Sequence, residues 1–401
     1  MPEWPTTPLS SLLTQHVPSA VAPAPDDIVQ FAGVRWYGDG LFVREERRGA
    51  AIKGKIYALK PGTLIYNRLF AWKQSFAVVG DEFEGVVVSN EFPQFDVDPS
   101  QATPEFLALY CSSPSFAEKA LNLSTGAAAV SRNRLKEPDF LTLPAPVPPL
   151  AVQAGIVEVV TVIDAVIKAL EAEIDAAAAV RVALLGELLR RRDETWEERP
   201  VGDLGTIIRG KRFVKSDYVP EGIGCIHYSQ IHTDFGAHTA EVRTRLPEEM
   251  RSKLRFAAPG NLVIAGTSEN VEGVLKAVAW LGDDSVAVHD DAYIFDHSLE
   301  PRFAAHLFVS PAFREQVERV YSDTKVVRVS RDNLARLVVP VPPRAKQAEI
   351  SDAMDAMDQQ ITTTAAELDS ARLARAALRD ALLDRRIEVI LPAPSTDESD
   401  E

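Results

Sequence analysis

A repeat with one fixed offset constrains the fold of this chain more than any other feature of its sequence. The stretch PVPPLAVQAGI, residues 146–156, returns as PVPPRAKQAEI, residues 340–350. The match continues without a gap, so that residues 146–192 align on residues 340–386. The offset of 194 residues is close to half of the 401-residue chain, which indicates a duplicated unit.

Both copies are predicted to be long helices that begin after the prolines, because proline is tolerated before or within the first helical turn. Apolar residues then alternate in steps of four and three, the spacing of a coiled-coil seam. Each seam covers 33 residues, about 50 Å of helix. The first seam holds Ile156, Val160, Ile163, Ile167, Leu170, Ile174, Ala177, Arg181, Leu184 and Leu188, and the second holds Ile350, Met354, Met357, Ile361, Thr364, Leu368, Ala371, Arg375, Leu378 and Leu382.

Two interpretations of the seams are open. The helices pack against each other, or each amphipathic helix covers the core of its own domain. A helix of this length has too little globular surface to lie against, since most helices in globular proteins have about 10–14 residues, so the first interpretation is preferred. Arg181 and Arg375 occupy the same seam position in the two copies, and polar seam residues fix register and partner at a cost in stability.

The segments before the two helices correspond more loosely. Trp4 matches Trp196, Pro-Gly turns precede an apolar run in both halves, and SPSFAEKA at 113–120 parallels SPAFREQV at 310–317. Between these anchors the two sequences diverge, but both are rich in short apolar runs and turn glycines, as in mixed α/β domains. The predicted order is therefore variable domain, long helix, variable domain, long helix.

Composition limits the class of protein. Two cysteines cannot form a disulfide framework, the N-terminus does not resemble a signal peptide, and no apolar run is expected to reach the ~20 residues that span a bilayer. These features indicate a cytoplasmic protein. The net charge of −15 argues against nucleic-acid binding, yet nine basic and only three acidic residues lie between Arg35 and Lys73.

With these motifs in this order, the chain resembles the specificity subunit of type I restriction-modification systems. The resemblance covers nearly the whole chain and rests on the doubled set: the opening tryptophan, the Pro-Gly turn, the SPSF/SPAF helix start, and the proline-rich junction followed by glutamine and isoleucine. The chain departs from many members just before the junction glutamine, where Val152 and Lys346 replace an acidic residue.

The resemblance implies an α+β fold: two mixed α/β target-recognition domains in a pseudo-twofold arrangement, joined by two long antiparallel coiled-coil helices. The expected boundaries are a first recognition domain at 1–145, a spacer helix at 146–193, a second recognition domain at 194–339, a second spacer helix at 340–388, and a disordered acidic tail at 389–401.

The resemblance also implies a function. Each recognition domain reads one half of a bipartite, asymmetric sequence in double-stranded DNA, and the helices set the spacer. Two modification subunits, which bind S-adenosylmethionine and methylate adenine, dock around the helices, and ATP-dependent restriction subunits can join. The chain itself is expected to be non-catalytic and to hold no cofactor. The spacer and partner interface is expected at Ile156, Ile163, Ile167, Leu170, Arg181, Leu188, Ile350, Met357, Ile361, Leu368, Arg375 and Leu382.

Clusters of basic and aromatic residues are the candidate DNA contacts, because arginine and lysine neutralise phosphates and can read guanine edges. A single basic residue is more often a solvated surface charge, so the clusters are better candidates than their members. They comprise Arg35, Trp36, Tyr37, Arg44, Arg47, Arg48, Lys53, Lys55, Arg68 and Lys73 in the first half, and Arg209, Lys211, Arg212, Lys215, Lys325 and Arg328 in the second.

Motifs for catalysis and metal binding are not evident in the sequence. VPPL and VPPR lack the polar and aromatic flanks of an amino-methyltransferase motif, and the chain has no P-loop. No metal site is expected in CIHYSQIHTDFGAH, because it lacks a C-x-x-C pair. Its possible ligands are Cys225, His227, His232 and His238, and His289 with Asp290 and Asp291 is expected to end a strand in a polar turn.

Two other functions remain open from the residues alone. A coiled-coil adaptor that binds only proteins would fit the acidic net charge but not the basic clusters. A self-contained DNA methyltransferase or nuclease would need the motifs that the chain lacks.

Overall fold

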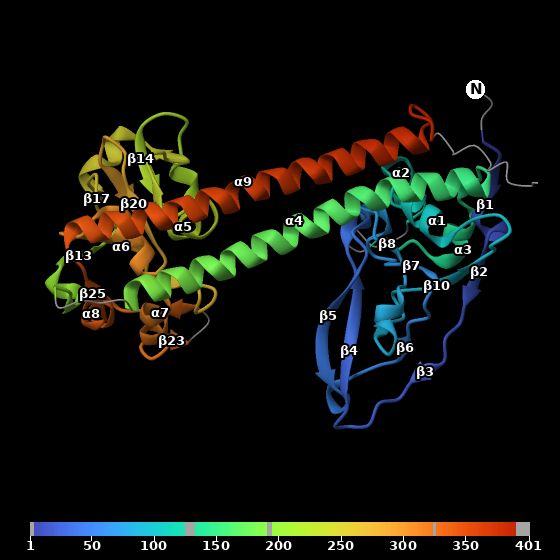
Figure 1. The fold of residues 1–401 in the computed structure, drawn as a ribbon, viewed down its shortest axis with the longest axis horizontal. Helices are drawn as coiled ribbons and strands as arrows, with labels where there is room; N and C mark the ends of the chain where they lie inside the picture. The colour runs from blue at the N-terminus through green and yellow to red at the C-terminus, as the bar shows by residue number, and fades with distance from the viewer. Residues whose placement is uncertain (1–3, 125–132, 191–194, 324–325, 390–401) are drawn as a thin grey trace, which may run out of the picture. The chain divides into compact units, whose positions relative to one another are not determined.

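The computed structural model describes residues 4–124, 133–190, 195–323 and 326–389. They belong to two compact units, one made of residues 1–169 and 368–401 and the other of residues 170–367. Helices α4 (Leu150–Arg190) and α9 (Arg344–Leu383) each contribute to both units (Figure 1). The expected acidic tail beyond residue 389 lies outside the described residues.

The first unit contains the first domain, built from two larger sheets of order β2-β10-β7-β8 and β3-β6-β9-β4-β5 and the pair β1-β11. Helices α1 (Pro104–Cys111), α2 (Pro114–Leu123) and α3 (Glu137–Thr142) follow the sheets. The strands are β1 (Thr6–Pro8), β2 (Leu13–His16), β3 (Ala20–Val21), β4 (Ile28–Val34), β5 (Leu41–Arg48), β6 (Ile56–Ala58), β7 (Leu64–Tyr66), β8 (Phe76–Val78), β9 (Val87–Ser89), β10 (Gln94–Val97) and β11 (Pro144–Pro146).

The second unit contains the second domain, with sheets of order β13-β22-β18-β20-β15, β16-β14-β21-β17 and β19-β24-β23 and the pair β12-β25. Its helices are α5 (Tyr228–Thr233), α6 (Pro301–Leu307), α7 (Pro311–Val317) and α8 (Arg331–Arg336). The strands are β12 (Glu197–Pro200), β13 (Gly205–Arg209), β14 (Ile223–Ile226), β15 (His238–Thr239), β16 (Thr244–Leu246), β17 (Phe256–Ala257), β18 (Leu262–Ala265), β19 (Thr267–Ser268), β20 (Ala277–Trp280), β21 (Val286–Val288), β22 (Ala292–His297), β23 (Ser322–Asp323), β24 (Val327–Arg328) and β25 (Val338–Val341).

The two domains share one topology, including the part where their sequences diverge. The order β2-β10-β7-β8 corresponds to β13-β22-β18-β20, and β6-β9-β4-β5 corresponds to β17-β21-β14-β16. The pair at the centre of the second sheet is parallel in both domains, β4 with β9 and β14 with β21. Strands β3 in the first domain, and β15, β19, β23 and β24 in the second, are additions. The duplication therefore extends through the whole domain, although the sequence shows it only at the anchors.

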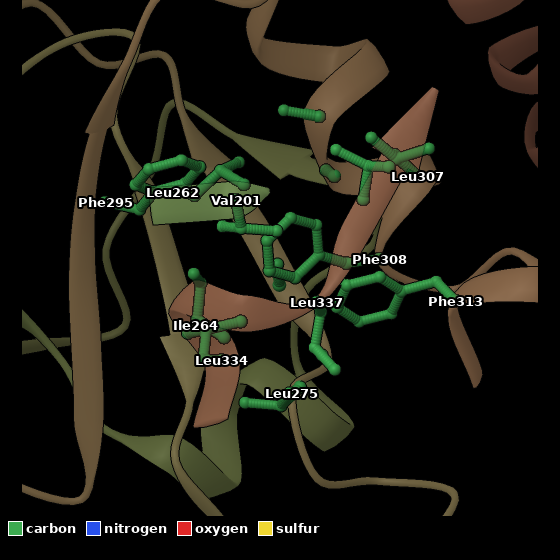
Figure 2. Close-up of a cluster of buried hydrophobic side chains, with 14 of the residues drawn as sticks. Val201, Leu262, Ile264, Leu275, Phe295, Leu307, Phe308, Phe313, Leu334 and Leu337 are labelled. Carbon is green, nitrogen blue, oxygen red and sulfur yellow. The ribbon is translucent and has the colours of Figure 1, made fainter. Parts of the chain in front are cut away.

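Both interpretations of the long helices that the sequence leaves open are correct: the helices pack against each other, and they also cover the domain cores. Every predicted seam position is buried or half-buried, and none is exposed. The helix ends also join the domain cores: Ile156 and Leu382 pack in the first domain, and Leu185 and Met354 in the second. Figure 2 shows the second of these cores, where Phe295, Phe308 and Phe313 gather with aliphatic side chains. Pairing and core-covering thus apply to different stretches of the same helices.

The sequence predicts no apolar run long enough to span a membrane, but one helix is long and apolar enough by its composition, so this prediction is wrong. Within the part of the chain that the structure describes, helix α4 contains an 18-residue window of mean hydropathy 2.0, of which 22% is buried. The helix is apolar on its seam face and also rich in alanine and valine outside it, as at Val162 and Val180. Its seam also carries Arg181, which is ion-paired to α9, as expected for a helix that packs against another helix.

Candidate functional site

An ion pair joins α4 to α9 in each unit. In the second unit, Arg181 on α4 donates from Nε and Nη2 to the carboxylate of Asp358 on α9, with Nη2 2.8 Å from Oδ2. In the first unit, Arg375 on α9 donates in the same way to Asp164 on α4, with Nη2 3.2 Å from Oδ2. The repeat aligns the two arginines with each other and the two aspartates with each other. The helices therefore run antiparallel within each unit, and each seam arginine is paired with an aspartate of the facing helix.

Each seam arginine also contacts the domain of its unit. Arg375 Nη2 lies 3.4 Å from the carbonyl oxygen of Gly38, in the turn between β4 and β5. Arg181 Nη2 lies 3.1 Å from Nδ1 of His306 on α6. The arginines thus connect the helix pair to each domain, a role that the sequence does not reveal.

Asp355 on α9 is the centre of a charged network in the second unit. Its carboxylate lies 2.8 Å from Nη1 of Arg302, 2.9 Å from Nε2 of the fully buried His306, and 3.5 Å from Nε2 of His238 on β15. Burial raises the pKa of Asp355, but the hydrogen bonds from His238 and His306 outweigh it and hold the pKa well below its usual range. The hydrogen bond to Asp355 raises the pKa of His238. The repeat aligns Asp355 with Thr161, so the first unit lacks this carboxylate.

The junction glutamines bind the start of each long helix to its domain. Gln153 Nε2 donates to the carbonyls of Pro148 and Gln101, both at 2.8 Å, and its Oε1 accepts from the backbone N–H of Thr103, the N-cap of α1, at 2.9 Å. Gln347 repeats this pattern with the carbonyl of Pro342 and the backbone N–H of Glu300, the N-cap of α6, each at 2.8 Å. The sequence motif that occurs twice therefore forms the same hydrogen-bonded junction in both domains.

The basic cluster of the first domain lies mainly on and beside β5, an edge strand of its sheet. Arg44 and Arg47 both pair with Glu45, with Arg47 Nε 2.8 Å from Oε2, so the local excess of positive charge is partly neutralised. Arg48, Lys53 and Lys55 form no ion pair or side-chain hydrogen bond with any described residue, which leaves these three cations for solvent or a ligand.

Two candidates of the first domain have contacts that fix them within it. The Nε of Arg68 lies 3.0 Å from Oε2 of Glu137, and its Nη1 donates to the carbonyl of Asn90, so its donors serve the fold. Lys73 Nζ lies 3.4 Å from the centre of the Trp36 ring, a cation–π contact.

The basic cluster of the second domain follows β13. Arg209 at the end of this strand lies 3.8 Å from the carboxylate of Asp290 and donates to its backbone carbonyl. Lys211 and Arg212 come next in the loop and have exposed side chains, as do Lys215 in a short 3-10 turn and Arg328 on β24, whereas Lys325 lies outside the described residues. Of the sequence-predicted DNA contacts, Arg44, Arg47 and Arg48 therefore lie on β5, Lys211, Arg212 and Lys215 follow β13, and Arg328 lies on a separate sheet.

Three of the four residues that were considered as metal ligands have polar partners, whereas the ring of His232 packs against Tyr228 and its buried Nε2 has no hydrogen-bond partner among the described residues. Cys225 Sγ lies 3.2 Å from Thr244 Oγ1, His227 Nδ1 lies 2.7 Å from Ser229 Oγ, and His238 contacts Asp355.

Two other groups of the described residues bring ligand atoms within 4.8 Å of one another: His289 with Asp290 and Asp291, and His306 with Asp355 and Asp358. In the second group the guanidinium groups of Arg181 and Arg302 already neutralise the carboxylates, which disfavours a cation there. In the first, His289 Nε2 is 2.9 Å from the carbonyl of Phe213 and braces the loop after β13, in keeping with the polar turn expected from the sequence.

Comparison with known proteins matches residues 193–371 to the family described as type I restriction modification DNA specificity domain. A curated relative, the type I restriction enzyme MjaVIII specificity subunit of Methanocaldococcus jannaschii, is 20% identical over 271 residues. That alignment covers 62% of this chain and 63% of the relative, so it spans less than two thirds of the relative's length.

Solved structures share the fold. A chain from a study of complex assembly and conformational transition of the type I R-M system has a TM-score of 0.58 and 16% identity, covering 96% of this chain and 98% of that one. The S subunit of a type I restriction-modification system from M. genitalium has a TM-score of 0.50 and 12% identity, covering 94% and 96%. The domain match and the relative confirm the resemblance expected from the sequence: the chain is similar to type I restriction-modification specificity subunits, and residues 193–371 match the DNA specificity domain of that family.

Proposed function

We propose that this chain is the sequence-specific DNA-binding subunit of a type I restriction-modification complex. In this proposal each domain reads one half of a bipartite, asymmetric site in double-stranded DNA. The main support for this proposal is that two domains have the same strand topology but different surface residues. Both are attached to the same pair of helices through equivalent glutamine junctions. Two domains built alike but surfaced differently suit two different half-sites.

The helix pair would fix the gap between the half-sites and dock two modification subunits. The equivalent ion pairs Arg181–Asp358 and Arg375–Asp164 support this role, because they give the two units the same helix register. Two copies of one partner could then bind equivalent surfaces. The modification subunits would bind S-adenosylmethionine and methylate an adenine in each half-site, restriction subunits would be further partners, and the chain itself would be cytoplasmic and non-catalytic.

Co-expression with the methyltransferase encoded beside the chain tests this proposal, followed by mapping of N6-methyladenine across the host genome. We expect one motif with two fixed halves and a constant gap, and exchange of residues 1–140 for another such domain should change only one half. Methylation that does not depend on the chain would refute the proposal.

The acidic net charge of −15 keeps a protein-only adaptor as the second candidate. Its test is the salt dependence of DNA binding, because phosphate contacts release counterions and give a steep dependence, whereas an adaptor binds no DNA at any salt concentration.

A further inference from the structure

A cavity of about 460 Å³ lies at the tip of the β4–β5 hairpin in the first domain. Its size falls within the range of about 300–1,000 Å³ typical of small-ligand sites. The side chains that line it combine aromatic rings with both signs of charge, and include Arg35, Trp36, Tyr37, Asp39, Phe42 and Arg44.

Two backbone irregularities place these side chains. Tyr37 has φ of +62°, in the left-handed region that a residue with a Cβ adopts only at a cost. The pairing of β4 with β5 shifts between Phe31, opposite Glu45, and Ala32, opposite Val43, so Arg44 has no partner in the ladder. Bulges of this kind redirect a side chain at a sheet edge, and here they bring Arg44 to the cavity. A strained turn that keeps a tyrosine where glycine or asparagine would fit better points to a use for the ring.

Some side chains of the cavity are engaged in contacts within the domain, whereas others are available to a ligand. The Trp36 ring is held by Lys73 on one side and by Phe70, whose ring centre is 5.3 Å away. The Tyr37 side chain is 57% exposed and has no ring contact or hydrogen bond with any described residue. The Arg35 guanidinium lies 5.0 Å from the Phe42 ring and forms no ion pair within the described part of the chain. One aromatic face and one cation are thus available together.

We propose that this cavity binds a nucleobase that leaves the stack in the half-site read by the first domain. Tyr37 stacks on the face of the base, and Arg35 and Asp39 supply a donor and an acceptor for its edge. Aromatic platforms beside cations suit nucleobases because each base has a π-face and adjoins a phosphate. Extrusion of a base from duplex DNA requires such a pocket, because the loss of stacking and pairing must be offset by new contacts. The inference rests on the proposed DNA-binding function.

Among its described residues, the second domain has no equivalent turn. Its corresponding strands, β14 and β16, are joined through α5 and β15 rather than by a tight hairpin. The cavity beside β14 and β16 is lined by other residues, including Gly224, Val242 and Arg245, so the half-site read by the second domain serves as an internal reference for the Tyr37 pocket.

The test uses the chain assembled with the methyltransferase encoded beside it and duplexes that carry the mapped methylation motif. Each base of both half-sites is replaced in turn by 2-aminopurine, whose fluorescence rises when it leaves the stack. The variants are Tyr37→Asn, which suits the left-handed backbone but removes the ring, Tyr37→Trp, which keeps a stacking face, and the control Val17→Asn, which removes an 81% exposed apolar side chain of the same domain.

We expect a fluorescence change at one position of the half-site read by the first domain, separate from the methylated adenine. Tyr37→Asn should abolish it and weaken binding about 5- to 100-fold, in line with the usual effect of losing one base–aromatic stack, while Tyr37→Trp and Val17→Asn retain both. A wild-type complex with a bipartite motif but no such position, or Tyr37→Asn binding as wild type, would overturn the pocket and leave the proposed function intact. Absence of any methylation motif would overturn both.

Discussion

Removal of the carboxylate of Asp164 tests the seam most directly. The side chain of Arg375 is 10% exposed and that of Asp164 is 36% exposed. Asp164→Ala therefore leaves a nearly buried guanidinium whose remaining hydrogen-bond acceptor among the described residues is the Gly38 carbonyl, at 3.4 Å, with the charge of Asp39 nearby. Loss of one partner of a fully buried pair costs about 3–5 kcal/mol. Because Asp164 is partly solvated, we expect about 2 kcal/mol, which lowers the Tm of a unit of this size by about 4–8 °C.

The double variant Asp164→Ala, Arg375→Met shows whether the cost comes from the stranded charge. An apolar side chain of similar length in place of the arginine should recover most of the lost stability, because burial of an ion pair costs nearly as much solvation as it returns. Calorimetry of the full chain measures both, with Asp175→Ala, an exposed carboxylate on the same helix, as the control. If Asp164→Ala lowers Tm no more than Asp175→Ala, or if the second substitution adds to the loss, the reasoning is refuted.

Three further predictions address the junction, the charged network and the seam. Gln153→Ala removes three hydrogen bonds of a fully buried side chain and should cost about 2 kcal/mol or more in the free energy of unfolding. A denaturation midpoint equal to that of the wild type would contradict this. The pKa of His238 is raised, so its contact with Asp355 contributes its full share of the folding stability below about pH 6.5 and loses it as the pH rises through the raised pKa. His238→Ala should therefore cost more stability at about pH 5.5 than at about pH 8.5. An equal cost at both pH values would show that the ring is not protonated in the folded chain. Ile167→Glu should lower the free energy of unfolding by about 2 kcal/mol and reduce co-purification with the modification subunit. The control Val166→Glu replaces a side chain that is 48% exposed and should have little effect on stability. Equal losses of stability in the two variants would mean that Ile167 does not face the partner helix.

The elements that could be predicted from the amino-acid sequence are those whose information is local or repeated. Proline position and four-three apolar spacing depend only on neighbouring residues, so they predict the seam positions and two long helices that begin after the prolines. In the structure these helices begin at Leu150 and Arg344. The offset of 194 residues also makes Asp164 equivalent to Asp358 and Arg181 equivalent to Arg375, although it does not show which aspartate each arginine meets.

Contacts between distant residues follow only from the tertiary structure. Gln153 is visible in the sequence as a repeated residue, but its partners Gln101 and Thr103 lie on another segment, and no local pattern identifies them. The network of Arg302, His306 and Asp355 could not be predicted for the same reason, since its members come from two helices about fifty residues apart in the chain.

The shared topology of the two domains is also beyond the reach of sequence patterns. Strand order depends on which backbone groups pair across the sheet, and many different side chains satisfy the same pairing, so β4-β5 and β14-β16 could diverge while keeping their places. The surface pocket at Tyr37 could not be predicted either. It depends on one residue with positive φ and on one β-bulge, and neither can be identified from a single sequence. Local spacing specifies the helices of this protein, whereas long-range pairing specifies its domains and the surfaces that they present.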